Sequence, residues 1–200
     1  MLLALPCLAN SPKMFFAEYR FVHPDIKEES FEATSRKVWR IGFKYLRIQE
    51  APDPDQNIHG LIISNAPDTY IINLFVKSGK HVVDRGESID VHVPVFQQPN
   101  LLQKIKELEM GHENAFFLQH AAQSIGTKII DDIDCDVLMI KSNEYELTLY
   151  RRKDNGNPLQ IGIRNGNIIY DLKYLTYEPD LEPDFTLFEV PSDIRIIEAN

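Results

Sequence analysis

The stretch Leu159–Thr176 reads LQIGIRNGNIIYDLKYLT, and it decides the fold class of this chain. On either side of Asn165-Gly166 apolar and polar side chains alternate with a period of two residues, which is the pattern of a half-buried β-strand. Asn-Gly suits the positive φ angles of a two-residue type I′ turn, so the stretch predicts a β-hairpin. Successive hairpins build an antiparallel sheet.

The same alternation runs along most of the chain. In the first half, Phe15, Ala17, Tyr19 and Phe21 share one face of a strand, and Ser78-Gly79 has the composition of a tight turn. Strands are predicted over Met14–Val22, Phe31–Arg40, Phe43–Glu50, His59–Ser64, Thr69–Val76, Lys80–Val83, Ser88–Val93, Ile125–Ile133, Val137–Ser142, Tyr145–Lys153, Leu159–Arg164 and Asn167–Thr176.

Two short helices are predicted in the middle of the chain. Pro99–Met110 has a proline near its start, apolar residues on one side and Gly111 as its stop, and Glu113–Ala122 follows it. A sheet of so many strands curls rather than staying flat. The sequence therefore predicts a mainly β (α+β) fold: a curved antiparallel half-barrel of about ten strands, with a short helical hairpin covering its concave face.

The chain length and the N-terminus set the domain organisation. With 200 residues the chain fits one domain, which we expect over residues 10–200. Met1–Ala9 reads MLLALPCLA, which resembles the remnant of a secretory signal peptide and predicts a periplasmic protein. Two alternatives stay open for this segment, a lipid anchor on Cys7 and an ordinary first strand.

Composition narrows the possible partners. The net charge of −9 and the pI of about 5.1 disfavour nucleic acid, because phosphate backbones need a basic surface. Apolar residues make up 44% of the chain, which is enough for a core. If Cys7 is removed with the signal, Cys135 has no partner for a disulfide. We therefore expect the core alone to hold the fold.

Few residues carry recognisable catalytic or metal-binding chemistry. The chain has no Gly-rich phosphate loop, no Gly-x-Ser-x-Gly elbow, no Cys-x-x-Cys and no His-Glu-x-x-His. His81 and His92 could face each other across a turn, but a third zinc ligand cannot be placed. Asp132-x-Asp134-x-Asp136 has the spacing of a calcium loop, yet later positions of that loop do not fit. We expect no cofactor, no metal and no enzymatic activity.

The C-terminal sequence resembles a known family. Tyr177-Glu178-Pro179-Asp180 leads into Pro183–Pro191, where Asp184, Leu187, Phe188 and Pro191 match a closing "D-x-x-L-F-x-x-P" pattern. This pattern is similar to that of the LolA/LolB-like superfamily, which includes periplasmic lipoprotein carriers, RseB and LppX. The hairpins before it also fit the family.

A second set of residues extends the resemblance. Tyr45–Ile48, Leu61–Ile63, Ile72–Phe75 and Gly79–His81 look like a group of uncharacterised exported bacterial proteins. The superfamily resemblance implies a half-barrel capped by helices and an apolar cargo such as acyl chains. The predicted helical lid is shorter than a dedicated lipoprotein carrier needs, so the resemblance implies the broader binding class.

Our functional hypothesis is non-catalytic periplasmic binding of a lipid, an acyl chain or another apolar small molecule. A lipoprotein or lipid carrier is one form of this function. The reason is that large apolar side chains gather on strand faces that one helical hairpin cannot fully cover. The first alternative is an envelope interaction or stress-sensing module with a filled core, which binds a protein. The second is a metal-dependent enzyme. The predicted pocket consists of Phe15, Tyr19, Trp39, Phe43, Tyr45, Ile63, Tyr70, Ile72 and Leu74, covered by Leu102, Ile105, Phe116 and Phe117.

Overall fold

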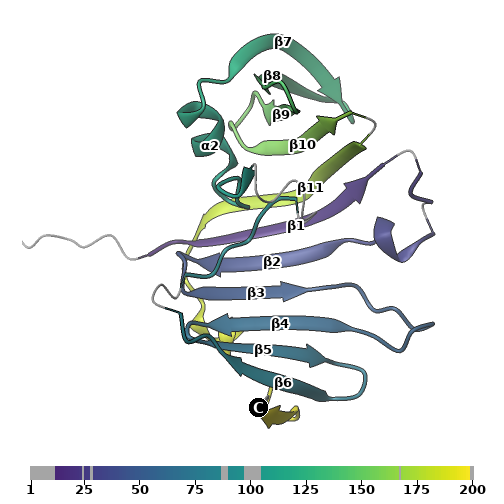
Figure 1. Ribbon diagram of the computed structural model, residues 1–200, viewed down its shortest axis with the longest axis vertical. Coiled ribbons are helices and arrows are strands. Elements are labelled where there is room, and N and C mark those ends of the chain that lie inside the picture. The colour runs from purple at the N-terminus through teal and green to yellow at the C-terminus, as the bar shows by residue number, and fades with distance from the viewer. Residues whose placement is uncertain are drawn as a thin grey trace, which may run out of the picture.

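The described chain forms one large, curved, open β-sheet, shown in Figure 1. The computed structural model describes residues 12–23, 25–27, 29–86, 90–96, 105–166 and 168–198. In these residues twelve strands are hydrogen-bonded in the order β12-β6-β5-β4-β3-β2-β1-β11-β10-β9-β8-β7. The bounds are β1 Met14–Val22, β2 Arg36–Ile41, β3 Tyr45–Gln49, β4 Gly60–Asn65, β5 Asp68–Asn73, β6 Ser78–Val83, β7 Gln123–Ile130, β8 Ile133–Lys141, β9 Glu146–Arg152, β10 Pro158–Asn165, β11 Ile168–Leu181 and β12 Arg195–Glu198.

The sheet consists of two antiparallel meanders joined in the middle. Strands β1 to β6 form one meander and β7 to β11 the other, and β1 pairs with β11 from Met14↔Leu181 to Val22↔Asp171. The mainly β, curved and open architecture predicted from the alternation is confirmed. The β10–β11 hairpin is also confirmed, because its ladder closes at Asn165↔Ile168 with Gly166 at a φ of +59°.

The predicted turn at Ser78-Gly79 is wrong. Both residues open β6, and the turn lies at 74–77, where Lys77 has a φ of +50°. Gly79 serves a different purpose, because a Cβ atom there would lie 2.7 Å from Cγ1 of Ile72 on the neighbouring strand. The glycine permits close approach within the sheet rather than a reversal of the chain.

Strand β12 departs from the purely antiparallel prediction. It runs parallel to β6, with Arg195 opposite Ser78 and Glu198 opposite His81. Its short length gives it little alternation to recognise. Strand β11 also extends to Leu181, beyond the predicted strand end at Thr176, and so includes Glu178-Pro179-Asp180.

Part of the predicted helical hairpin lies in the described residues. Helix α2, Glu113–Gln119, matches the second predicted helix. Half of the first predicted helix, residues 99–104, lies outside the described residues, and its predicted end at Met110 is wrong, because Glu109 forms a bridge with Pro94. Two 3-10 turns, η1 Phe31–Ala33 and η2 Phe185–Phe188, complete the helical elements described. None of the described helices has the length and apolar character that crossing a bilayer requires.

The two faces of the sheet carry separate cores. We call the face that packs against α2 the inner face and the opposite one the outer face. The inner cluster includes Ala17, Tyr19, Val38, Leu46, Val95, Leu108, Phe116, Phe117, Leu147, Leu149, Ile161, Ile163, Leu172 and Tyr174. The outer cluster consists of Met14, Ile41, Leu61, Ile63, Ile72 and Phe188, with partly buried neighbours around them.

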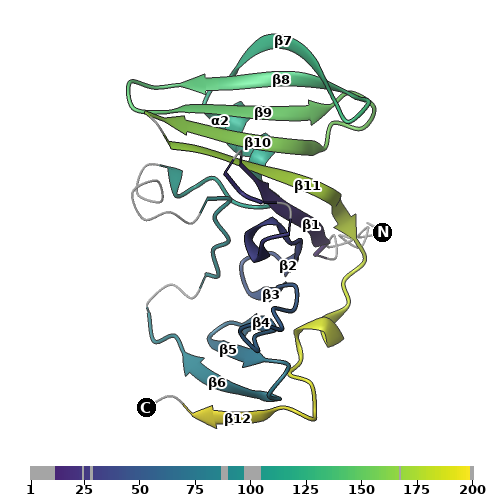
Figure 2. The ribbon, with the colours of Figure 1, turned by 90° about the vertical axis from the view of Figure 1, so that its right-hand side faces the viewer.

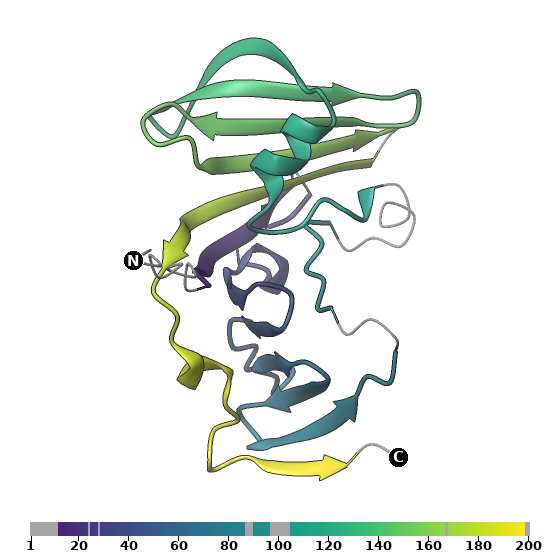
Figure 3. The same ribbon diagram turned by 90° about the vertical axis from the view of Figure 1, so that its left-hand side faces the viewer.

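The C-terminal segment covers the outer face of β2 to β5. Figures 2 and 3 show this yellow segment along one side of the lower strands, while the teal segment after β6 lies on the other side. Its anchor is Phe188, which is 3% exposed and whose ring centroid lies 5.6 Å from that of Tyr45. The outer face of this half is therefore closed by the chain itself.

We predict that Phe188→Ala destabilises the protein by about 3–5 kcal/mol, because it leaves a cavity in the outer cluster. Phe185→Ala is the matched control. Phe185 also contacts Tyr45, at 5.2 Å between ring centroids, but it is 46% exposed. We expect its loss to cost at most about 1 kcal/mol. Urea unfolding of the three proteins measures both values, and equal losses would contradict the assignment of Phe188 as the anchor.

Candidate ligand-binding groove

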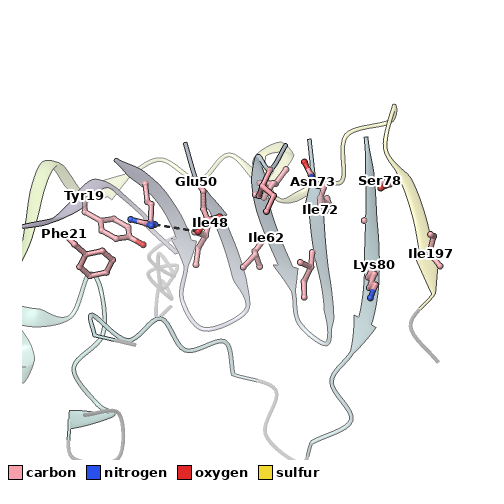
Figure 4. Close-up of a pocket in the computed structure, with 16 residues that line it drawn as sticks. Tyr19, Phe21, Ile48, Glu50, Ile62, Ile72, Asn73, Ser78, Lys80 and Ile197 are labelled. Carbon is pink, nitrogen blue, oxygen red and sulfur yellow. Dashed lines mark ion pairs between the residues drawn. The ribbon is translucent and has the colours of Figure 1, made fainter. Parts of the chain in front are cut away.

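The inner face of the lower strands is hollowed. A cavity of about 760 Å³ lies over β1 to β6 and β12, and Figure 4 shows side chains from these strands around it. We call this cavity the groove. Its size is in the range of pockets that hold small molecules.

The floor of the groove is a row of isoleucines aligned across the strands. The register places Ile48 opposite Ile62 and Ile62 opposite Ile71, and the row continues through Lys80 to Ile197. Directly opposed residues point to the same face, so the isoleucines are neighbours from Ile48 to Ile71, and Lys80 separates Ile71 from Ile197. Four interstrand spacings separate its ends, a span of about 19 Å.

The apolar side chains of the groove remain accessible. Ile71 and Ile197 are both 53% exposed and Ile58 is 40% exposed, whereas Leu61 and Ile63 on the outer face of β4 are fully buried. The same strands are therefore apolar on both faces, but only one face is packed shut. Contiguous exposed apolar surface in a concavity marks a binding site more often than it marks a solvated surface.

A polar row runs beside the isoleucines. Arg36 lies next to Glu50, with 3.7 Å between Nε and Oε1, and Glu50 pairs with Gly60 through its backbone N–H. The row continues through Asn73 and Ser78. Glu50 lies across the gap that Gly60 leaves, because a Cβ on Gly60 would come within 2.5 Å of its Oε2. The groove thus has an apolar side and a polar side.

Aromatic side chains form the β1 end of the groove. Tyr19 and Phe21 lie there, and the guanidinium of Arg36 lies 5.4 Å from the ring centroid of Phe21 and 5.5 Å from that of Phe31. Burial raises the pKa of Tyr19 to about 12, while the nearby Arg36 charge opposes this rise. Tyr19 is therefore a neutral phenol near pH 7.

The structure divides the predicted pocket residues between the two faces. Tyr19 lines the groove; Ile72 borders it, but its side chain belongs to the outer cluster and is 2% exposed. The outer face also holds Trp39, Tyr45, Ile63, Tyr70 and Leu74. Alternation indicates which side chains share a face, but it does not tell which face a distant segment covers.

The remaining predicted pocket and cover residues lie away from the groove. Phe15, Ile105, Phe116 and Phe117 are buried in the inner cluster. Phe43 is 39% exposed, with the guanidinium of Arg40 5.0 Å from its ring centroid. Leu102 lies outside the described residues.

Sequence reasoning misses most of the groove. Phe21, Ile48, Ile62, Ile71 and Ile197 line it, and none of them is among the predicted pocket residues. A signal is present, since Leu61-Ile62-Ile63 and Ile71-Ile72 are runs without a polar residue. Strands that are apolar on both faces need cover on both, so such runs point to a second interface.

A buried charged cluster fixes the segment after β6 on the inner face. Arg40 Nη1 donates to Glu109 Oε2 at 2.9 Å and to the carbonyl oxygen of Met110 at 3.0 Å, and His92 also hydrogen-bonds Glu109. Arg40 is 3% exposed and Glu109 is 5% exposed. This cluster lies among packed side chains outside the groove, so we assign it a structural role.

A buried carboxylate holds the start of α2. Glu113 is fully buried and accepts hydrogen bonds from the hydroxyls of Tyr174 and Tyr177 and from the backbone N–H of Gly111. Burial raises the pKa of Glu113, and the hydrogen bonds that it accepts oppose this rise. In the described part of the chain no three His, Cys, Asp or Glu side chains converge to hold a metal ion.

Solved structures share this fold at low sequence identity. An uncharacterised conserved protein from Thermus thermophilus matches with a TM-score of 0.52 and 10% identity, covering 94% of this chain and 91% of its own. The Pseudomonas aeruginosa MucA/MucB complex matches with a TM-score of 0.47 and 11% identity, covering 92% of this chain and 58% of the other.

A putative outer membrane lipoprotein-sorting protein domain from Vibrio parahaemolyticus matches with a TM-score of 0.35 and 12% identity, covering 83% of this chain and 85% of its own. Identities this low show a shared fold alone. Neither a family model nor a curated protein sequence matches the chain.

Strand β12 closes the far end of the groove and is held on the outer face by a histidine. His81 Nε2 lies 2.7 Å from Asp68 Oδ1, and its Nδ1 lies 2.8 Å from Glu198 Oε2 on β12. The imidazole stacks on Tyr70 with 4.7 Å between ring centroids. The hydrogen bonds to Asp68 and then to Glu198 raise the pKa of His81.

We predict that His81 stabilises the fold more strongly at low pH than at high pH. Its folded pKa is raised above the ordinary 6.5, so its contribution is fully present below that value and is lost as the pH rises through the folded pKa. Urea unfolding of the wild type and of His81→Gln at a series of pH values across neutrality measures it. The stability difference should shrink with rising pH; a difference that stays constant or grows would contradict the pairing of a protonated His81 with the two carboxylates.

Proposed function

We propose that this protein binds an elongated apolar ligand, such as an acyl chain, in the groove on its inner face, without catalysing a reaction. The observation that carries the proposal is the aligned row of accessible isoleucines in a cavity of about 760 Å³, over strands whose other face is closed. Ile71 and Ile197 lose their exposure when such a ligand binds.

The energetics suit binding of a chain-like molecule. Each buried CH₂ group contributes about 0.8 kcal/mol, so a chain lying along the row gains useful affinity without any covalent step. The interaction-module alternative needs a hollow filled by side chains, whereas the described side chains leave the groove open.

The polar groups of the groove favour binding over catalysis. Its titratable side chains are Tyr19, Arg36, Glu50 and Lys80, and they contain no nucleophile beside a general base. We propose a periplasmic location together with this ligand. The segment Met1–Ala9 predicts secretion, and an apolar molecule that crosses the water between two membranes needs a protein that shields it.

We predict that Ile71→Glu weakens binding of an apolar fluorescent probe at least about tenfold, or about 1.4 kcal/mol, because it places a charge in the middle of the apolar row. Ile129→Glu is the matched control. Ile129 is an isoleucine on β7, 66% exposed and at the opposite edge of the sheet. Fluorescence titration of the wild type and both variants gives the affinities.

Two results would contradict this prediction. Equal weakening by both variants would place the probe elsewhere than in the groove. No binding by the wild type, together with a native mass spectrum free of any copurified apolar molecule, would remove the proposal and favour a protein partner.

A further inference from the structure

One cation of the groove is largely buried and incompletely paired. Arg36 has a side chain that is 14% exposed, and its Nη1 atom is buried without a hydrogen-bond partner among the described residues. Its ion pair with Glu50 is long, at 3.7 Å, and Glu50 is 37% exposed. A buried guanidinium N–H without an acceptor is costly, so an anionic oxygen that reached it would be held strongly.

The surroundings of Arg36 fix its position. Its guanidinium contacts the rings of Phe21 and Phe31, which leaves the planar group little freedom to turn. Tyr19, directly opposite Arg36 in the β1–β2 ladder, is a neutral phenol that also lines the groove. A pre-organised fork of donors beside a neutral hydroxyl suits a carboxylate.

The other cation of the groove is less suited to this role. Lys80 lies between Ile71 and Ile197, away from Arg36, and is exposed. An exposed ammonium binds an anion weakly, because both groups keep their hydration and salt screens them. The anion subsite therefore belongs at the Arg36 end, and the row of isoleucines extends away from it.

The charge of the groove is opposite to that of the chain. Its described lining carries Arg36 and Lys80 against Glu50, a net charge of +1, whereas the whole chain carries −9. A single positive charge balances a monoanionic headgroup better than a phosphate, which carries more than one negative charge near pH 7. The local charge thus selects a carboxylate.

We propose that the ligand is a single-chain fatty carboxylate, whose headgroup binds Arg36 beside Tyr19 and whose chain lies along Ile48, Ile62 and Ile71 toward Ile197. This inference rests on the proposed function, since it assumes that the groove takes an apolar chain. On binding, the carboxylate replaces Glu50 as the main partner of Arg36, and Glu50 turns toward solvent.

The test compares two ligands that differ only in the headgroup. Hexadecanoic acid and hexadecanol compete for the groove against an uncharged fluorescent probe, at a pH at which the acid is ionised. We expect the wild type to prefer the acid about tenfold or more, because the alcohol cannot accept a charged hydrogen bond from Arg36 as a carboxylate does. A lysophosphatidic acid of equal chain length tests whether a phosphate headgroup binds instead.

Three variants assign the preference to a residue. Arg36→Gln should abolish the preference for the acid, and Lys80→Gln, which removes the same charge away from Arg36, should retain it. Glu50→Gln removes the competing carboxylate, so it should increase the ratio of the affinity for the acid to that for the alcohol. This variant keeps the buried arginine in place, so it remains informative if Arg36→Gln does not fold.

Each outcome bears on one of the two proposals. Loss of the preference in Lys80→Gln but not in Arg36→Gln would overturn the headgroup assignment. Equal binding of acid and alcohol by the wild type, or tighter binding of the phosphate, would overturn the carboxylate proposal while apolar binding in the groove stands. Failure of all three ligands to displace the probe would instead overturn the proposed function.

Discussion

The antiparallel ladder between β1 and β11 is the contact on which the rest of the structure depends. It joins two meanders that are distant in sequence into one sheet, and it buries Ala17 and Leu172 completely at the junction. The inner cluster spans this junction, because Tyr19 and Val38 from one meander pack in the same core as Tyr174 from the other. Each meander alone would expose its part of that core to water.

The groove results from unequal covering of the two faces. On the outer face, the segment that follows β11 lies over the lower strands and closes them around Phe188. On the inner face, α2 and the segment fixed by Arg40 and Glu109 cover mainly the region around the junction. The lower strands are apolar on both faces but are tightly packed only on the outer face. The isoleucine row on the inner face therefore stays accessible.

Sequence patterns predict the parts of this structure that local chemistry determines. Alternation identifies most of the strands, although it misses β12 and residues 90–93 of the predicted strand Ser88–Val93 form no strand. Asn165-Gly166 identifies the β10–β11 hairpin. The grouping of Trp39 with Tyr45 on one face is also correct, but that face is closed by Phe188. Which face stays open depends on where a segment more than a hundred residues away in the sequence lies, and no local pattern encodes this. Gly79 is a second example, because position 79 requires a glycine only since Ile72 on another strand approaches it closely.

The parallel strand β12 gives the groove an unusual dependence on chain connectivity. Its wall runs from Tyr19 on β1 to Ile197 on β12, and the whole second meander lies between β6 and β12 in the sequence. Contacts of such long sequence separation must close a long loop before they form, as the β1–β11 ladder must also do. Strand β12 is short and lies at the edge of the sheet, so local unfolding would remove this wall of the groove before it opens the central ladder.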